Sequence, residues 1–170
     1  MHKIKRWIKF LFFVICTMSA SISLAESPRL QLDGPLARDY VHKTEWMRCS
    51  IGQHWENDTC IGKALMLSVA EAKEVIQRVS KLEGGGWRLP TLKELRLLVT
   101  EVENRPNDFI PNIDTKAFPN TFPGPYWTSD QSFYSRRYQW SINFYTGQSF
   151  NRFFPSQKLA VRLVRDFAIK

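Results

Sequence analysis

The sequence predicts an α+β domain in which two amphipathic helices pack on a small, mainly antiparallel twisted sheet, with long irregular loops between the elements. Two capping boxes, each followed by apolar residues at helical spacing, predict the helices. The alternation of apolar and polar residues through 139–144 and the dense apolar run at 160–164 predict strands. Each helix has one apolar side, so each requires another layer to cover it.

The first helix is expected to begin after Ser68. Ser68 and Glu71 have the spacing of a capping box, in which each side chain accepts a hydrogen bond from the backbone amide of the other residue. The glycine triplet 84–86 is expected to end the helix, because Gly adopts the left-handed conformation that closes a helix. The apolar side consists of Val69, Ala72, Val75, Ile76 and Val79.

The second helix is expected to follow Thr91, which forms a second capping box with Glu94. Pro90 keeps Leu89 extended, so this helix cannot begin earlier. Its apolar side consists of Leu92, Leu95, Leu98, Val99 and Val102.

The run Trp87, Arg88, Leu89 and Pro90 precedes the second helix and is interpreted as a structural signature. Trp87 is expected to close the core between helix and sheet. Arg88 is expected to be held by a buried carboxylate or by backbone carbonyls.

The rest of the chain predicts strands joined by loops. Residues 104–125 are rich in Pro, Asn and aromatic residues, which indicates a long loop held to the core by its Phe and Ile side chains. Strands are expected at 126–128, at 139–144 and in a return to residue 153 after a turn near Gly147. A last strand at 160–164 is expected to be central. Residues 26–39 show no apolar period and are interpreted as a flexible arm.

Residues 1–25 have the three parts of a cleaved signal peptide: four basic residues, an apolar stretch from 10 to about 22, and Ser23-Leu24-Ala25 at the cleavage position. The apolar stretch is shorter than the roughly 20 residues that cross a bilayer, so we expect no integral membrane span after cleavage. A retained signal anchor is the alternative. A lipid anchor at Cys16 is disfavoured, because Ile15 is bulky where a lipoprotein signal has a small residue. The domain proper is expected to cover residues 40–170.

The charge of the mature chain is modest. The whole chain carries a formal charge of +8, from 24 Lys and Arg residues and 16 acidic residues. The signal segment holds four of the basic residues and none of the acids, which leaves 20 − 16 = +4. The basicity therefore predicts no nucleic-acid partner, although it favours acidic surfaces or polyanions through an attraction that salt weakens.

Cys49 and Cys60 remain after cleavage, and in a chain that enters an oxidising compartment they are expected to form a disulfide. Closing this short loop contributes about 2–3 kcal/mol, mainly by restricting the unfolded chain. The alternative is a metal site, but the mature chain adds only His42 and His54, without a second pair of ligands at suitable spacing.

Five motifs follow one another along residues 40–166: 46–55 with 60–62, 86–91, 118–121, 126–129 and 161–165. They read WMRCSIGQHW with CIG, GWRLPT, FPNT, YWTS and VRLVR. In this order and spacing they resemble the Lcl C-terminal domain family, also called the DUF1566 family.

The resemblance implies a C-type-lectin-like fold, distantly similar to that of formylglycine-generating enzymes, in an exported bacterial protein. The namesake domain ends collagen-like adhesins that attach to sulfated host polysaccharides, whereas this chain has no Gly-x-y stalk. Formylglycine-generating enzymes depend on cysteines near the end of their domain. Residues 161–165 contain no cysteine, so that oxidase chemistry is not expected.

Residues 133–158 are the strongest binding candidate, because they interleave cations with aromatic residues. Arg binds sulfate, phosphate or carboxylate through two parallel hydrogen bonds, while exposed aromatic rings stack on sugars. The alternative is that the aromatic residues are core and the cations only solvate a hairpin. The predicted ligand-binding residues are Arg136, Arg137, Tyr138, Arg152 and Lys158.

No metal or cofactor is expected, with a calcium site in the long loop as the alternative. Asn and Asp side chains there supply oxygen ligands, although such residues beside Pro also make turns. The candidate ligands are Asn104, Asn107, Asp108, Asn112 and Asp114.

These observations predict an exported, noncatalytic binding module, periplasmic or extracellular, whose ligand is an acidic polysaccharide or an envelope or host surface protein. The alternative is a periplasmic structural or assembly partner that uses the aromatic loop as a protein interface. An enzyme on the formylglycine-generating scaffold is the least favoured interpretation.

Overall fold

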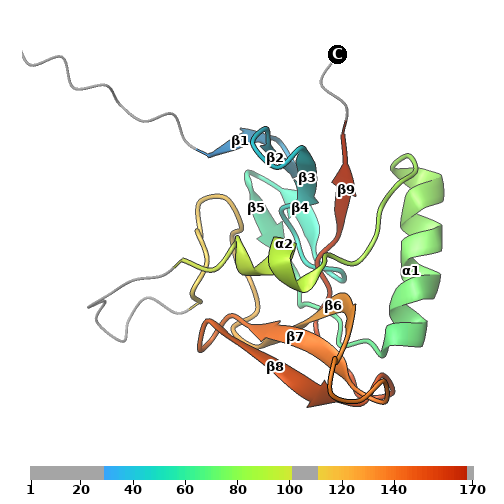
Figure 1. The fold of residues 1–170 in the computed structure, drawn as a ribbon. Coiled ribbons are helices and arrows are strands. Elements are labelled where there is room, and N and C mark those ends of the chain that lie inside the picture. Colours follow the sequence, from blue (N-terminus) through green and yellow to red (C-terminus); the bar gives the residue numbers. More distant parts are fainter. Residues whose placement is uncertain (1–28, 101–110, 168–170) are drawn as a thin grey trace, which may run out of the picture.

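The computed structural model describes residues 29–100 and 111–167 (Figure 1). The predicted signal peptide therefore lies outside the described residues. None of the helices within the described part of the chain is long and apolar enough to cross a bilayer. The elements are β1 (Leu30–Asp33), β2 (Leu36–Asp39), β3 (Thr44–Met47), β4 (His54–Glu56), β5 (Thr59–Ile61), α1 (Val69–Leu82), α2 (Leu92–Arg96), β6 (Pro125–Gln131), β7 (Gln139–Asn143), β8 (Gln148–Phe153) and β9 (Val164–Asp166).

The α+β class is confirmed, but the strands form three separate sheets instead of one. The sheets have the orders β1-β2-β3-β9, β4-β5 and β6-β7-β8, and neighbouring strands in all of them are antiparallel. Figure 1 shows the β6-β7-β8 sheet at the bottom, the larger sheet at the top, α2 between them and α1 along one side. Isolated bridges from Tyr126 to Ala160 and from Arg88 to Val164 join these parts.

The first helix agrees with the prediction at both ends. The Ser68 hydroxyl accepts from the Glu71 amide at 3.3 Å, and the Glu71 carboxylate accepts from the Ser68 amide at 2.7 Å. At the other end the Glu83 amide donates to the Val79 carbonyl, and Gly84 follows with φ of +81°. The glycine is needed there because L side chains rarely adopt this conformation.

The second helix is shorter than predicted. Its capping box is present, but the helix ends at Arg96 instead of continuing through Leu98 and Val99, and the last predicted helical residue, Val102, lies outside the described residues. The amides of Leu98 and Val99 make tighter bonds, three residues back, and the Thr100 amide donates to the Asn112 carbonyl. Pairing of Val99 with Ile113 outside the helix replaces the expected last turns, so a tertiary contact overrides the local helical pattern.

The predicted flexible arm is wrong over residues 30–39, which form β1 and β2. The two strands pair with each other, and β2 pairs with β3. The sequence shows no alternation of apolar and polar residues here, because β1 is largely exposed and one of the two buried residues of β2 is Asp39. Asp39 is held there by Arg29 and His42, at 2.8 Å and 2.9 Å.

The predicted disulfide between Cys49 and Cys60 is confirmed, with a Cα–Cα distance of 5.4 Å. The loop that it closes contains the β4–β5 hairpin. Asn57 and Asp58 turn this hairpin with φ of 47° and 59°, a conformation that Asn and Asp tolerate better than most residues.

The core has two parts, and α1 covers one of them. Trp87 and Trp127 pack with Val69 and Ala72 of α1, while Tyr126, Phe118 and Phe144 lie in the other cluster with Leu95 of α2. Residues 160–164 run fully buried through the middle, as expected. They are not the predicted strand, however, because regular pairing begins only at Val164, where β9 joins β3.

Candidate functional site

The predicted basic aromatic segment forms a surface at one end of the β6-β7-β8 sheet. The loop between β6 and β7 carries Arg136 and Arg137, and β8 carries Arg152, and all three side chains are exposed. Pairing of Gln139 with Phe153 brings the loop beside the end of β8. We call this the hairpin surface, and it consists of Phe133, Tyr134, Arg136, Arg137, Tyr138, Arg152 and Phe154.

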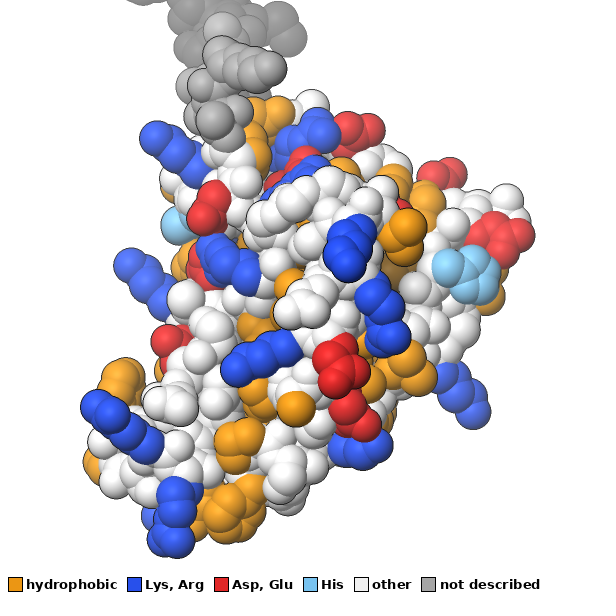
Figure 2. All heavy atoms as spheres, turned by 90° about the vertical axis from the view of Figure 1, so that its right-hand side faces the viewer, with side chains coloured by type: hydrophobic (Ala, Val, Ile, Leu, Met, Phe, Trp, Pro, Cys, Tyr) orange, Lys and Arg blue, Asp and Glu red, His pale blue; other side chains and the backbone are white. Residues whose placement is uncertain are grey.

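The aromatic side chains of the hairpin surface face solvent. Phe133 and Tyr134 are 84% and 86% exposed, and Phe154 is 47% exposed. The rings of Tyr138 and Phe154 are 4.9 Å apart, which joins the loop to the segment after β8. In Figure 2, cationic and apolar side chains lie together in the lower part of the molecule, where Figure 1 places this sheet. Ile142 and Phe144 are fully buried, as the alternative interpretation expects, whereas Phe133, Tyr134 and Phe154 are not core residues.

The cations of the hairpin surface are available to a ligand. No carboxylate of the described residues lies within ion-pair distance of Arg136, Arg137 or Arg152. An unpaired guanidinium keeps its planar fork of donors for an external oxyanion.

Lys158, the fifth predicted ligand-binding residue, is exposed and paired with a carboxylate at the beginning of α1. Its ammonium lies 3.0 Å from the carboxylate of Glu71 at the beginning of α1. The hydrogen bond from the Ser68 amide and this ammonium lower the pKa of Glu71 to about 2, so its carboxylate stays charged and retains Lys158.

The structural signature holds α2 to the rest of the domain. The Arg88 guanidinium donates to both Glu94 carboxylate oxygens at 2.8 Å and to Asp166 of β9 at 2.6 Å. Burial tends to raise the pKa of Glu94, but the hydrogen bonds from Arg88 and the Thr91 amide outweigh it and lower this pKa to about 2. Arg88 is thus held by carboxylates, although Glu94 is only partly buried and Asp166 is exposed, whereas a buried carboxylate was predicted.

The neighbours of Arg88 also have architectural roles. Trp87 is 4% exposed in the core beside α1, and the Arg165 guanidinium lies 4.4 Å from the centre of its ring. Leu89 is buried in the same cluster, and the Pro90 carbonyl accepts from the Ser129 amide at 2.7 Å.

In the described part of the long loop, the two candidate calcium ligands make hydrogen bonds within the protein. Asn112 donates to the carbonyl oxygens of Phe144 and Tyr145, and Asp114 accepts from the amides of Lys116 and Ala117. The other three candidate calcium ligands, Asn104, Asn107 and Asp108, lie outside the described residues. Phe118 is 1% exposed, and Phe122 is partly buried against the same core cluster.

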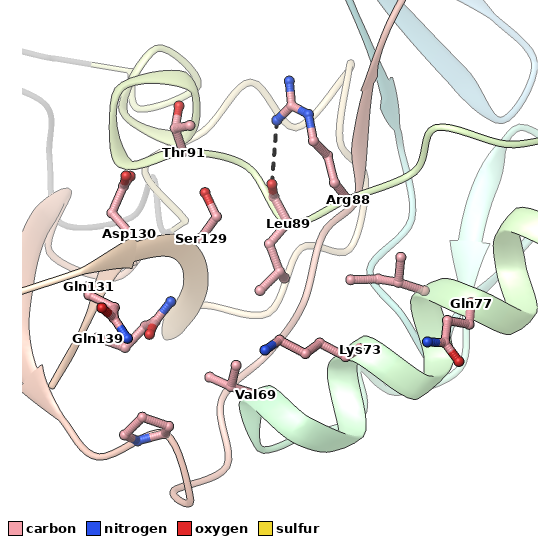
Figure 3. Close-up of a pocket in the computed structure, with 12 residues that line it drawn as sticks. Val69, Lys73, Gln77, Arg88, Leu89, Thr91, Ser129, Asp130, Gln131 and Gln139 are labelled. Atoms are coloured by element: carbon pink, nitrogen blue, oxygen red, sulfur yellow. Dashed lines mark hydrogen bonds between the residues drawn. The ribbon is translucent and has the colours of Figure 1, made fainter. Parts of the chain in front are cut away.

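A groove of about 890 Å³, the α1 groove, lies between α1 and the β6–β7 strands beside the hairpin surface (Figure 3). Lys73 and Gln77 extend into it from α1, and Gln131 and Gln139 form the opposite wall. Sequence reasoning missed this site, because its two walls are more than fifty residues apart in the chain. Its lining consists of Val69, Lys73, Ile76, Gln77, Arg88, Leu89, Thr91, Ser129, Asp130, Gln131, Gln139 and Pro155.

A family model described as the Lcl C-terminal domain matches residues 36–165. The chain belongs to this family. The match begins within β2, so it includes part of the segment that sequence analysis assigned to an arm. No curated protein matches the chain. The family assignment points to a domain of a surface-associated protein, and the disulfide is consistent with export.

Two arginines of this Lcl C-terminal domain are buried, which sequence reasoning also missed. Arg162 is 0% exposed and donates to the carbonyls of Met47 and Arg48 and to the hydroxyls of Ser50 and Thr121. Burial lowers its pKa. Arg48 donates to the carbonyls of Gly34, Lys116 and Ala117, and its guanidinium lies 4.1 Å from the centre of the Trp55 ring. Both residues fall in family-like motifs, but an Arg in a motif does not by itself indicate burial.

Proposed function

We propose that this Lcl C-terminal domain is an exported, noncatalytic binding module that holds an acidic polysaccharide on the hairpin surface. The observation that carries the proposal is the exposed group of Arg136, Arg137 and Arg152, without carboxylate partners among the described residues, beside exposed aromatic rings. Cations attract the anionic groups of such a ligand, and aromatic rings pack on the apolar faces of its sugars.

Polysaccharide fits this surface better than a folded protein. A protein interface normally has a desolvated apolar centre with a polar rim. Here arginines and aromatic residues follow one another along the loop, which suits a repeating chain that alternates anionic groups and ring faces. The modest net charge of the mature chain means that binding would depend on this local group of cations.

The noncatalytic part of the proposal rests on how the histidines and carboxylates are used. His42 is bonded to buried Asp39 in the β2–β3 region, and His54 is paired with Glu56 on the β4–β5 hairpin. The part of the chain that the structure describes contains no group of three or more His, Cys, Asp or Glu residues arranged to hold a metal ion. Glu94 and Asp166 are held by Arg88.

Retention of the mature protein on immobilised heparin, at a series of salt concentrations, tests the proposal. Arg136→Ala/Arg137→Ala should elute at lower salt than the wild type. The slope of log affinity against log salt should fall by about 2, because each lost contact with a polyanion removes about one released counterion. Elution of both proteins at the same low salt would remove the support for the hairpin surface.

Arg78→Ala/Lys81→Ala is the matched control. It removes the same charge from exposed positions near the end of α1, far from the β6-β7-β8 sheet (Figure 1). A control that elutes as early as the Arg136/Arg137 variant would mean that net charge, and not the hairpin surface, governs retention.

A further inference from the structure

The α1 groove contains one cation that the fold does not use. Lys73 is exposed, and within residues 29–100 and 111–167 no carboxylate lies within ion-pair distance of its ammonium. In Figure 3 its side chain leaves α1 and extends across the groove towards the opposite wall. Arg88, the other cation of the lining, already donates to Glu94 and Asp166. Lys73 is therefore the groove's binding group for an anion.

The opposite wall presents acceptors whose positions are fixed. The Asp130 carboxylate accepts from the Leu92 amide through Oδ2, and the Gln139 amide donates to the Thr128 carbonyl at 2.9 Å. In the described part of the chain, Asp130 Oδ1 and Gln139 Oε1 accept no hydrogen bond of their own. Asp130 is fixed by the bond to Oδ2, and Gln139 is fixed by the bond from its amide nitrogen. The second oxygen of Asp130 and the amide oxygen of Gln139 can therefore accept hydrogen bonds from the hydroxyls of a ligand.

The groove also has apolar side chains between these polar walls. Val69, Leu89 and Pro155 belong to the lining, and Figure 3 shows Leu89 and Val69 between Lys73 and the wall of glutamines. A ligand here thus meets a cation at one side, hydroxyl acceptors at the other and an apolar area between them. This combination matches one sugar ring that carries a carboxylate: its carbon–hydrogen face is apolar, and its edge bears hydroxyls.

We propose that the α1 groove binds a uronic acid residue of the same acidic polysaccharide, an inference that rests on the proposed function. Lys73 pairs with the carboxylate, while Asp130 and Gln139 accept from the sugar hydroxyls. The charge on Asp130 fixes the orientation, because it repels the carboxylate towards Lys73. The groove adjoins the hairpin surface in the chain at two places, since Gln139 follows Tyr138 and Pro155 follows Phe154.

The test is calorimetric titration with two ligands. One is an unsulfated tetrasaccharide of alternating glucuronate and N-acetylglucosamine, and the other is the same tetrasaccharide with its carboxylates reduced to alcohols. Wild type should bind the first ligand about fivefold more tightly, the effect of one partly exposed ion pair. Lys73→Gln should lose this fivefold part of the preference, and the cycle separates the Lys73–carboxylate contact from any attraction of the carboxylates to the hairpin surface.

Lys81→Gln, at an exposed position on the same helix, should keep the wild-type preference. Equal binding of the two ligands by wild type, no binding of either, or a Lys73→Gln variant with an undiminished preference for the carboxylate would each overturn the inference. The titration tests the α1 groove and heparin retention tests the hairpin surface, so either proposal can fail without the other. A Lys73-dependent preference alongside unaltered retention of Arg136→Ala/Arg137→Ala would keep the groove as a site and remove the hairpin surface.

Discussion

The arginines of this domain occupy three environments, and the environment decides what each side chain does. Arg136, Arg137 and Arg152 are exposed and available to an external anion. Arg88 is half-buried and shared between two carboxylates. Arg162 is fully buried among carbonyl and hydroxyl oxygens. A guanidinium group can thus bind a ligand, attach a helix to the domain or hydrogen-bond to buried oxygens, according to where the arginine lies.

At the residue scale, Glu94→Gln should lower the free energy of unfolding at pH 7 by about 2 kcal/mol, since Arg88 and Thr91 lose a charged acceptor. The folded-state pKa of Glu94 is lowered from 4.5 to about 2. Its stabilisation is therefore fully present above pH 4.5 and is lost as the pH falls towards 2. Urea unfolding of both proteins at pH 7 and pH 2.5 measures the difference.

Glu74→Gln, which removes a carboxylate from the exposed side of α1, is the control for this experiment. The wild-type advantage over Glu94→Gln should shrink strongly at pH 2.5. A difference that stays constant between the two pH values would show that the carboxylate charge is not what stabilises α2.

At the scale of the element, the beginning of α1 is joined to the rest of the domain by several polar contacts. The Val69 amide donates to the Pro155 carbonyl at 2.9 Å, and the capping box and the Glu71–Lys158 pair lie within the same turn. This end also forms one border of the α1 groove, because Val69 and Lys73 line it. Stability of the first turn is thus connected to the geometry of the proposed sugar site.

Ser68→Ala should therefore destabilise the domain by about 1 kcal/mol, because the Glu71 amide loses its acceptor. Ser80→Ala, within the same helix, should be neutral or slightly stabilising, because Ala is the better helix former. Thermal unfolding of the two variants makes the comparison. Equal destabilisation by both substitutions would contradict the role assigned to the cap.

At the scale of the whole molecule, Arg162 joins segments that are far apart in the chain. It links the end of β3, the beginning of the disulfide loop and Thr121 of the long loop to the buried segment 160–163. Its guanidinium also lies 4.7 Å from the centre of the Phe118 ring. One side chain thus supplies donors to the buried carbonyls of Met47 and Arg48 and also bonds to two hydroxyls, which have further partners in Tyr126 and Phe118.

Arg162→Met should cost about 3–5 kcal/mol, because an apolar side chain leaves the buried Met47 and Arg48 carbonyls without the donor that Arg162 supplies. Arg136→Met, at an exposed position, should change stability by less than about 0.5 kcal/mol. Urea unfolding followed by circular dichroism reports both values. A midpoint for Arg162→Met close to that of wild type would contradict the role of Arg162 as a central link.

Local chemistry made several features predictable. Both capping boxes, the end of α1, the three strands of the β6-β7-β8 sheet and the disulfide depend on residues close in sequence or on the only two cysteines left after the signal segment. The expected arm and the length of the second helix were wrong. In each case, a distant partner decided the structure: β3 for the arm and Ile113 for the helix.

The sequence by itself therefore determined the fold class, the family and the exposed cations of the hairpin surface, since propensities, caps and motifs act over a few residues. Only the tertiary structure decided that Arg162 is buried and that Lys73 faces Gln139 across a groove. The physical reason is that burial and pocket geometry depend on which surfaces meet. The surfaces that meet here belong to elements separated by much of the chain.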